Sequence, residues 1–254
     1  MNAAEVGVNG GRVQSVQRAA ALLAAIADSP EAQTAPDLAE RCGLNRSTAW
    51  RILTTLEDEG LVYRDPATNR YSIGHAVARL AAAGTEALPR AARPHLEELS
   101  RRTGETVSLA VPRGLQLVYV DQVQAPHVMA ADWLGRAVPF HATSTGKALL
   151  AWLRDEELEA ALAHPLLSFT DTTITDPAKL RAELERVHRR GYAISRGELE
   201  AALWGVSAPL LDRSRRPLAV VSVWGAAARL RSKGLDELGR ATAVTAAGAA
   251  RAMT

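Results

Sequence analysis

The sequence predicts an α+β protein with an N-terminal winged helix-turn-helix domain, a linker helix and a C-terminal α/β domain whose sheet is mainly antiparallel. Two observations support this division. Residues 12–74 hold three helical patterns followed by two β-rich runs around a turn, whereas residues 89–254 mix strand and helix patterns joined by short turns. The 254 residues are also enough to form two domains.

The composition is that of a globular protein, with 47% hydrophobic and 23% charged residues. No stretch has the roughly 18 uncharged apolar residues of a membrane helix, and the N-terminus lacks the pattern of a signal peptide. We therefore expect a cytoplasmic protein with no membrane partner. The single cysteine, Cys42, excludes an internal disulfide or a zinc site with paired thiolates, and we expect it to be an apolar filler.

The net charge favours no particular partner. It is +2 overall, and residues 1–75 carry seven basic and nine acidic side chains. Any prediction of DNA binding must therefore rest on where the charges lie rather than on their sum.

The first domain follows a short tail. Residues 1–11 are small, polar and glycine-rich without periodicity, which is typical of a disordered segment. A first helix is expected from about Ser15 to residue 27, a second over 35–42, and a third over 46–59. Thr34 with Asp37, and Asn45, are the expected N-caps of the second and third helices.

Two β-rich runs, 61–64 and 70–73, surround a turn at 65–69 and predict a hairpin. Three helices closed by a hairpin make a winged helix-turn-helix. Residues 75–88 then predict a linker helix that packs against a second copy of itself. Pro89 and Pro94 mark the expected boundary, after which a new helix runs to Thr103.

The remaining chain predicts a sheet with helices against it. Expected strands are 106–111, 115–120, 128–134, 192–195, 206–211 and 218–224, and expected helices are 144–153, 155–163, 178–190 and 235–253. A short turn at 112–114 makes the first strand pair antiparallel.

The third helix carries the residues that predict contact with DNA. Arg46, Ser47, Thr48 and Arg51 lie near its N-terminal end, the end that enters the major groove in helix-turn-helix proteins. Arginine can read guanine there with two hydrogen bonds. Further contacts are expected at the wing and at the start of the first helix. The predicted DNA-binding set is Gln14, Ser15, Arg18, Asn45, Arg46, Ser47, Thr48, Arg51, Arg64 and Arg70.

An adaptor that no longer touches DNA is the alternative for this domain, because helix-turn-helix shapes also serve as interaction modules. In that case the arginines would only be a solvated surface. Substitution of Arg46 and Arg51 would separate the two possibilities.

Residues 141–147, HATSTGK, form a second group of interest. They fail as a phosphate loop, because glycine is absent five residues before the Gly-Lys pair. Residues 142–146 nearly match a nucleophile elbow, which leaves open a serine hydrolase with Ser144 as nucleophile and His164 or His188 as base. The simpler interpretation is a helix start whose free N–H groups offer an anion site. The histidines lack metal-ligand spacing, so we expect neither metal nor cofactor.

Four of the five tryptophans lie in the second domain, and core filling is the simplest role for each. Trp133, Trp204 and Trp224 are the better candidates for the wall of a pocket, because they lie at predicted strand ends or after irregular chain.

These residues together resemble the IclR family of bacterial transcriptional regulators, from Val13 to about Met253. The resemblance is carried by nine short segments in order: VQSVQRA at 13–19, LAERCGLNRST at 38–48, RILTTL at 51–56, YSIG at 71–74, HAT at 141–143, GKA at 146–148, ITD at 174–176, RGY at 190–192 and AP at 208–209. It implies a winged helix, a linker helix and a GAF-like effector domain. It also implies homodimers, or dimers of dimers, on palindromic double-stranded promoter DNA, with a small organic or aromatic acid as effector.

The resemblance also implies an effector site. Its expected residues are Ala130, Trp133, Val138, Ser144, Thr145, Gly146, Ser195, Trp204, Gly205, Ser222 and Trp224. Compared with members that bind small keto acids, this chain has Ser195 where they have Asp, Gly205 where they have Cys, and Trp224 where they have a second serine. We therefore expect a larger or flatter effector, with its carboxylate at residues 144–146 and Ser195 and Ser222 as neutral partners.

Overall fold

The computed structural model describes residues 13–29, 31–113, 116–125, 135 and 137–252, and the side chains of 81–86 are not described. The chain divides into two compact units, Met1–Glu86 and Ala87–Thr254. Among the described residues, no helix is long and apolar enough to span a lipid bilayer.

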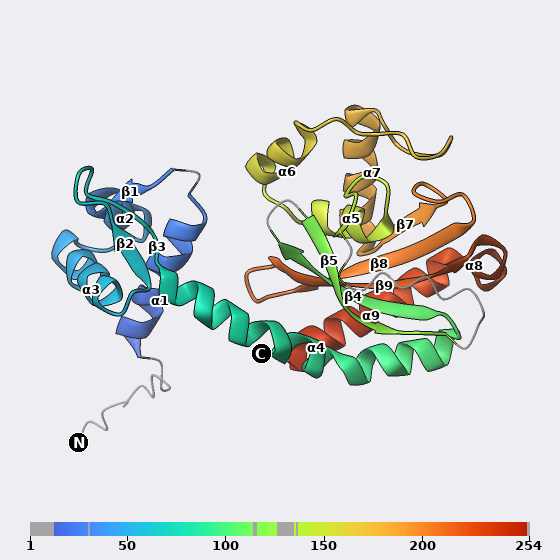
Figure 1. The fold of residues 1–254 in the computed structure, drawn as a ribbon, viewed down its shortest axis with the longest axis horizontal. Coiled ribbons are helices and arrows are strands. Elements are labelled where there is room, and N and C mark those ends of the chain that lie inside the picture. The colour runs from blue at the N-terminus through green and yellow to red at the C-terminus, as the bar shows by residue number, and fades with distance from the viewer. Residues whose placement is uncertain (1–12, 30, 114–115, 126–134, 136, 253–254) are drawn as a thin grey trace, which may run out of the picture. The chain divides into compact units, whose positions relative to one another are not determined.

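The N-terminal unit contains three helices and a small sheet (Figure 1). Its elements are α1 (Gln14–Ala27), β1 (Gln33–Thr34), α2 (Ala35–Arg41), α3 (Arg46–Asp58), β2 (Val62–Arg64) and β3 (Arg70–Ile73). Leu22, Leu38 and Leu53, one from each helix, are fully buried in a common core. The predicted helices and hairpin are confirmed, while β1, a two-residue strand that pairs with β3, was not predicted.

Local capping explains where these helices begin. Thr34 and Asp37 form the predicted capping box of α2, and Asn45 Oδ1 accepts the Thr48 N–H at 2.8 Å to begin α3. In the wing turn, Asp65 Oδ1 accepts the Ala67 N–H. These side chains satisfy N–H groups that the first turn of a helix or a tight turn leaves without a carbonyl partner.

The linker region differs from the prediction. A single helix, α4 (His75–Thr103), runs through both Pro89 and Pro94, so the expectation of two helices separated at Pro89 is wrong. Beyond the prolines, Leu96 and Leu99 are fully buried against the sheet. Their burial offsets the loss of backbone hydrogen bonds that an internal proline causes.

The C-terminal unit is built on a six-stranded antiparallel sheet with the order β6-β5-β4-β9-β8-β7 (Figure 1). The strands are β4 (Thr106–Arg113), β5 (Gln116–Val123), β6 (Ala137–Val138), β7 (Ala193–Arg196), β8 (Leu203–Leu211) and β9 (Pro217–Ala226). The antiparallel character is confirmed. The expected strand at 128–134 lies outside the described residues, as does part of the expected turn at 112–114.

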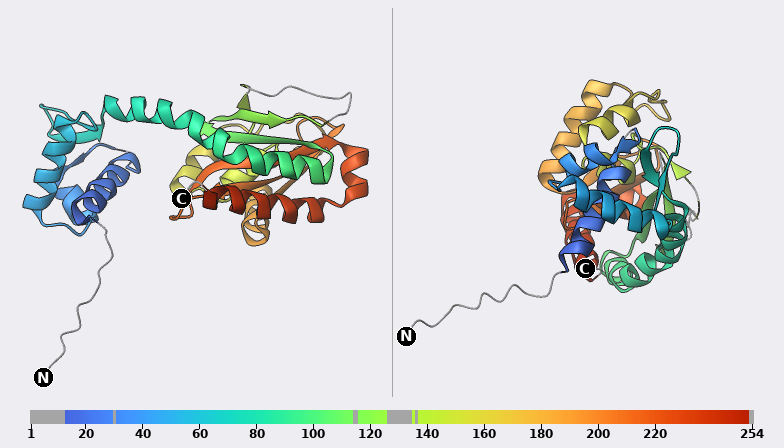
Figure 2. Two further views of the ribbon diagram at one scale, coloured as in Figure 1. Left: turned by 90° about the horizontal axis from the view of Figure 1, so that it is seen from below. Right: turned by 90° about the vertical axis from the view of Figure 1, so that its left-hand side faces the viewer.

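Helices cover both faces of this sheet (Figures 1 and 2). They are α5 (Ser144–Leu150), α6 (Asp155–Leu162), α7 (Pro177–Arg190), α8 (Ala227–Lys233) and α9 (Leu235–Ala252). One core joins the second part of α4 and α9 to side chains such as Val221 and Val223 of β9. A second core joins α5 and α7 to the opposite face through Val220. Of these helices, α8 was not predicted.

Candidate functional site

The exposed face of α3 carries two arginines without a carboxylate partner. Arg46 and Arg51 are exposed, and no salt bridge joins either to a described acidic side chain. The acidic Asp58 lies at the other end of the helix. The first half of α3 therefore presents positive charge to solvent, as an interface with phosphates or base edges requires.

Three of the other predicted DNA contacts belong to the cap of this helix. Asn45 Oδ1 accepts from both the Thr48 N–H and the Ser47 hydroxyl, which lies 3.0 Å away. Asn45 and Ser47 are exposed, whereas Thr48 is half-buried. The cap thus fixes the direction of the helix end and leaves Ser47 at the surface.

The remaining predicted contacts are spread over the wing and α1. Arg64 lies 3.7 Å from the carboxylate of Glu57, and Arg70 donates to the carbonyl of Ala32 at 2.6 Å. Gln14 and Ser15 are exposed at the start of α1, and Arg18, in the next turn, is half-buried. The two wing arginines therefore have partners within the unit, in contrast to Arg46 and Arg51.

Trp50 is a surface residue outside the predicted set of DNA contacts. It is 58% exposed on α3, between the two arginines in the sequence. Its neighbours on the inner face of the helix, Ala49 and Leu53, are fully buried. The 3.6-residue period that predicts those two as core could have placed Trp50 on the outside.

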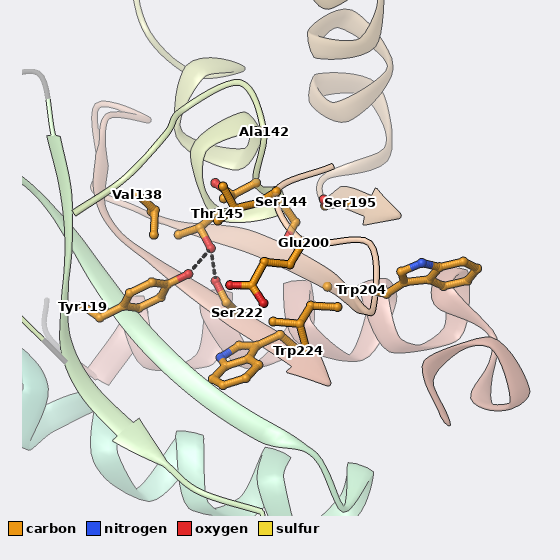
Figure 3. Close-up of a pocket in the computed structure, with 14 residues that line it drawn as sticks. Tyr119, Val138, Ala142, Ser144, Thr145, Ser195, Glu200, Trp204, Ser222 and Trp224 are labelled. Atoms are coloured by element: carbon orange, nitrogen blue, oxygen red, sulfur yellow. Dashed lines mark hydrogen bonds between the residues drawn. The ribbon is translucent and has the colours of Figure 1, made fainter. Parts of the chain in front are cut away.

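The C-terminal unit holds a cavity of about 60 Å³ between α5, the sheet and the loop that joins β7 to β8 (Figure 3). Its lining combines hydroxyl groups, apolar side chains and one carboxylate. The lining residues are Tyr119, Val138, Ala142, Thr143, Ser144, Thr145, Ser195, Leu199, Glu200, Leu203, Trp204, Gly205, Ser222 and Trp224.

Most of the predicted effector residues meet in this cavity. Val138, Ser144, Thr145, Ser195, Trp204, Gly205, Ser222 and Trp224 all contribute to its wall. Ala130 and Trp133 lie outside the described residues. Gly146 does not line the cavity, because its N–H donates to Thr143 Oγ1 at 3.0 Å and its Cα faces Phe140, where an added Cβ would come within 2.1 Å of the carbonyl oxygen.

A chain of buried hydroxyl groups forms one wall. Tyr119 Oη lies 2.8 Å from Thr145 Oγ1, which lies 2.8 Å from Ser222 Oγ. Ser207 Oγ lies 2.8 Å from both Ser222 Oγ and Ser144 Oγ. Burial raises the pKa of Tyr119, so its phenol stays protonated at neutral pH. The wall is therefore polar but uncharged.

The register of the sheet explains how these hydroxyls meet. Ser108, Ser222 and Ser207 are directly opposite one another on the neighbouring strands β4, β9 and β8. The alternation of side chains along a strand places all three on the face opposite the first core. Tyr119 and Ser207 were not predicted, although the same alternation from Gly205 points to Ser207.

The two tryptophans of the cavity lie differently. Trp224 is 9% exposed and its indole N–H donates to Ser108 Oγ at 3.0 Å. The Trp204 ring is directed away from the other labelled side chains (Figure 3), and the guanidinium of Arg231 lies 4.9 Å from its centroid. Trp224 is thus the aromatic wall, whereas the Trp204 ring packs elsewhere.

A buried ion pair ties α5 to the loop between β7 and β8. Lys147 is 1% exposed, and its Nζ lies 2.6 and 2.8 Å from the two carboxylate oxygens of Glu198. Burial lowers the pKa of Lys147, and the Glu198 carboxylate opposes this effect. Thr170 and Thr173 donate to carbonyls of the same loop at 2.7 and 2.6 Å. The start of the loop is therefore firmly anchored.

The geometry does not support a hydrolase. Ser144 Oγ accepts from Ser207 rather than from a histidine. His164 Nδ1 lies against the carbonyl of Ala160, and His188 Nδ1 against that of Ala151. Within the described part of the chain, no group of three or more His, Cys, Asp or Glu residues could hold a metal ion.

Each unit of the chain matches a known protein domain family. Residues 15–66 match the IclR helix-turn-helix domain, and residues 81–250 match the bacterial transcriptional regulator IclR C-terminal domain. The chain is 38% identical over 221 residues to the HTH-type transcriptional regulator Rv1719 of Mycobacterium tuberculosis, covering 87% of this chain and 85% of that protein. It is 31% identical to the transcriptional repressor IclR of Escherichia coli, covering 90% and 86%.

A solved structure of an IclR homologue also has this fold. The IclR homologue of Microbacterium hydrocarbonoxydans, complexed with 4-hydroxybenzoate, superposes with a TM-score of 0.61 and 26% identity, covering 94% of this chain and 98% of that one. The relatives are named as regulators rather than enzymes, so the hydrolase and adaptor alternatives lack support. The chain belongs to the IclR family of bacterial transcriptional regulators, with an N-terminal helix-turn-helix DNA-binding domain and a C-terminal effector-binding domain.

Proposed function

We propose that this chain binds palindromic promoter DNA as a homodimer through the first half of α3, and that a small organic acid in the cavity of the second unit controls this binding. The observation that supports the DNA interface is that Arg46 and Arg51 are exposed and form no salt bridge with a described acidic side chain. Free guanidinium groups can donate two hydrogen bonds to a guanine edge, or one or more to a phosphate.

Trp50 completes this interface. Its ring lies on the solvent side of α3 with 58% of its surface exposed, which is unusual for so large an apolar side chain. We infer that the indole contacts the apolar part of the groove, the methyl group of thymine or a deoxyribose. Gln14, Ser15 and the wing arginines add contacts to the phosphate backbone.

Two copies are needed to bind a palindrome. Leu80 on α4 is 63% exposed, and an apolar side chain on a helix that joins two units is suited to contact with its symmetry mate. Two recognition helices that bind together gain avidity, so a small change in the geometry of the dimer weakens both contacts at once. This coupling gives the effector its control over DNA binding. Tetramers, as dimers of dimers, would extend the same arrangement.

The effector is proposed to be an organic acid. The N–H groups of Ser144 and Thr145 open α5 and have no carbonyl four residues earlier within the helix to satisfy them. With the hydroxyls of Ser195 and Ser222, they form a neutral surface that can accept a carboxylate. The Microbacterium homologue holds 4-hydroxybenzoate, and Trp224 supplies an aromatic wall. We therefore expect benzoate-sized acids to bind more tightly than pyruvate.

The DNA interface is tested with a duplex that the protein itself selects from a random-sequence library. Arg46→Ala and Arg51→Ala should each weaken binding by about 5- to 150-fold, from a loss of about 1–3 kcal/mol per base contact. Arg113→Ala is the control, since Arg113 is an exposed arginine of the other unit. Fluorescence anisotropy at several salt concentrations gives the affinities. Unchanged affinity in both variants would refute this interface.

The effector cavity is tested by titration with benzoate and pyruvate, followed by tryptophan fluorescence. Gly205→Ala should weaken binding of either acid, because the added Cβ would lie 2.9 Å from Ser144 Oγ and 3.4 Å from the Cβ of Trp224. DNA binding without effector should be unchanged. Tighter binding of pyruvate than of benzoate would refute the expected size of the ligand.

A further inference from the structure

Glu200 is the one carboxylate among the described residues that line the cavity. It lies in the loop between β7 and β8, and its side chain extends toward Ser222 and Trp224 (Figure 3). None of the described lining residues is Lys, Arg or His, and no salt bridge joins Glu200 to a described cation. An acceptor-only, negatively charged group thus faces a neutral wall.

The loop backbone that carries Glu200 is anchored, although the Glu200 side chain itself is exposed. Two residues earlier, Glu198 is held by Lys147 of α5 at 2.6 and 2.8 Å. Gly197 has a φ of +74°, and a Cβ there would come within 2.8 Å of the Ala201 carbonyl, so the loop turns tightly at this point. The backbone of this loop is therefore anchored, and the exposed side chain of Glu200 reaches the cavity from it.

The chemistry of a carboxylate restricts what can lie opposite it. An ionised glutamate accepts hydrogen bonds and donates none, and it repels another carboxylate placed nearby. The hydroxyl wall imposes no such restriction, because each hydroxyl can donate or accept. Glu200 therefore restricts which ligand groups can lie opposite it more than the hydroxyls do.

We propose that Glu200 is a specificity residue that selects effectors with a hydrogen-bond donor, such as a hydroxyl or ammonium group, on the part of the molecule that faces the β7–β8 loop. This inference rests on the proposed effector function of the cavity and narrows it: an acid that binds here carries its carboxylate away from Glu200 and a donor toward it.

Four ligands test this proposal in two matched pairs, benzoate with 4-hydroxybenzoate and anisole with phenol. Each pair differs in whether a donor is present, and the second pair carries no carboxylate. Because Glu200 is exposed, calorimetry of the wild type should show the donor-bearing member of each pair binding about 3- to 10-fold more tightly, the range for a hydrogen bond that competes with water. In Glu200→Gln this ratio should fall severalfold, with the fold unchanged by circular dichroism.

Glu156→Gln is the matched control, because Glu156 is exposed on α6 away from the cavity lining. It should leave every ratio unchanged. A wild type without preference for the donors, or a preference that Glu200→Gln leaves intact, would overturn the inference. If either of these results is found but benzoate still binds, the role of Glu200 is rejected and the proposed acid class of effector stands. If phenol binds more tightly than anisole and neither acid binds, the role of Glu200 is supported and the acid class is rejected. If none of the four ligands binds, both the role of Glu200 and the acid class are overturned.

Discussion

Replacement of Lys147 by methionine should destabilise the C-terminal unit strongly. Methionine fills much of the volume of the lysine stem but removes the ammonium group that both carboxylate oxygens of Glu198 contact. Glu198 is only 6% exposed, so its charge would be left in a buried site without a partner. Breaking such a pair costs about 3–5 kcal/mol. For a unit of this size each kcal/mol lowers Tm by about 2–4 °C, which gives an expected decrease of about 6–20 °C.

The assay is thermal and urea unfolding in a Trp50→Phe background. This background removes the tryptophan of α3, so the fluorescence reports on the C-terminal unit, which holds Trp152 and Trp224. Lys179→Met is the control, because Lys179 is exposed on α7 and its replacement should change stability by less than about 0.5 kcal/mol.

The double variant Lys147→Met with Glu198→Leu makes the reasoning refutable. If the cost of the single variant comes from an unpaired buried charge, removal of both charges should restore most of the lost stability, because apolar replacements of buried pairs are often neutral. A double variant as unstable as Lys147→Met would show that the loss arises from packing instead. A cost below about 1 kcal/mol for the single variant would contradict the burial of the pair.

Three further substitutions have effects whose sign follows from the structure. Gly146→Ala should lower the free energy of unfolding by about 3 kcal/mol or more, since the added Cβ would lie 2.1 Å from the Phe140 carbonyl oxygen. Gly248→Ala in α9, where the nearest atom is 3.5 Å away, should raise it by about 0.5–1 kcal/mol. Melting curves of the two variants test both expectations. The Arg216 guanidinium holds the pKa of Glu157 at about 2, below its ordinary value of 4.5. Because the folded pKa is lowered, this carboxylate stabilises the fold by about 1–3 kcal/mol above pH 4.5 and loses that contribution as the pH falls toward 2. The Tm difference between wild type and Glu157→Gln should therefore shrink over that window, and a constant difference would contradict the ion pair.

The N-terminal unit was largely predictable because its signals are local. The apolar period of α3 and the caps at Thr34 and Asn45 depend only on residues close together in the sequence, and the structure has both features. The path of α4 was not predictable in this way. Pro94 is exposed, so water can satisfy the carbonyl that it leaves free, and burial of Leu96 and Leu99 depends on a sheet formed far along the chain.

The cavity of the C-terminal unit likewise depends on contacts between residues that are distant in the sequence. Ser144, Thr145 and Ser222 were expected, but their connection through Tyr119 and Ser207 depends on strand register, which a single sequence specifies only weakly. Glu200 stands in a loop without periodicity, so no local pattern pointed to it. Its place at the cavity follows from the anchoring of that loop by distant residues.

The single proton of Ser207 has a consequence for how the cavity can accommodate different molecules. Its hydroxyl has two acceptors at equal distance, the oxygens of Ser144 and Ser222 at 2.8 Å, and can donate to only one of them at a time. When it turns to Ser144, the Ser144 proton is free to meet a carbonyl or carboxylate of the guest. When it turns to Ser222, the Ser144 hydroxyl can donate to Ser207 Oγ in return, which leaves only its lone pairs for an incoming alcohol. A rotation about one C–O bond of Ser207 is thus enough to change whether Ser144 offers a proton or a lone pair to the cavity.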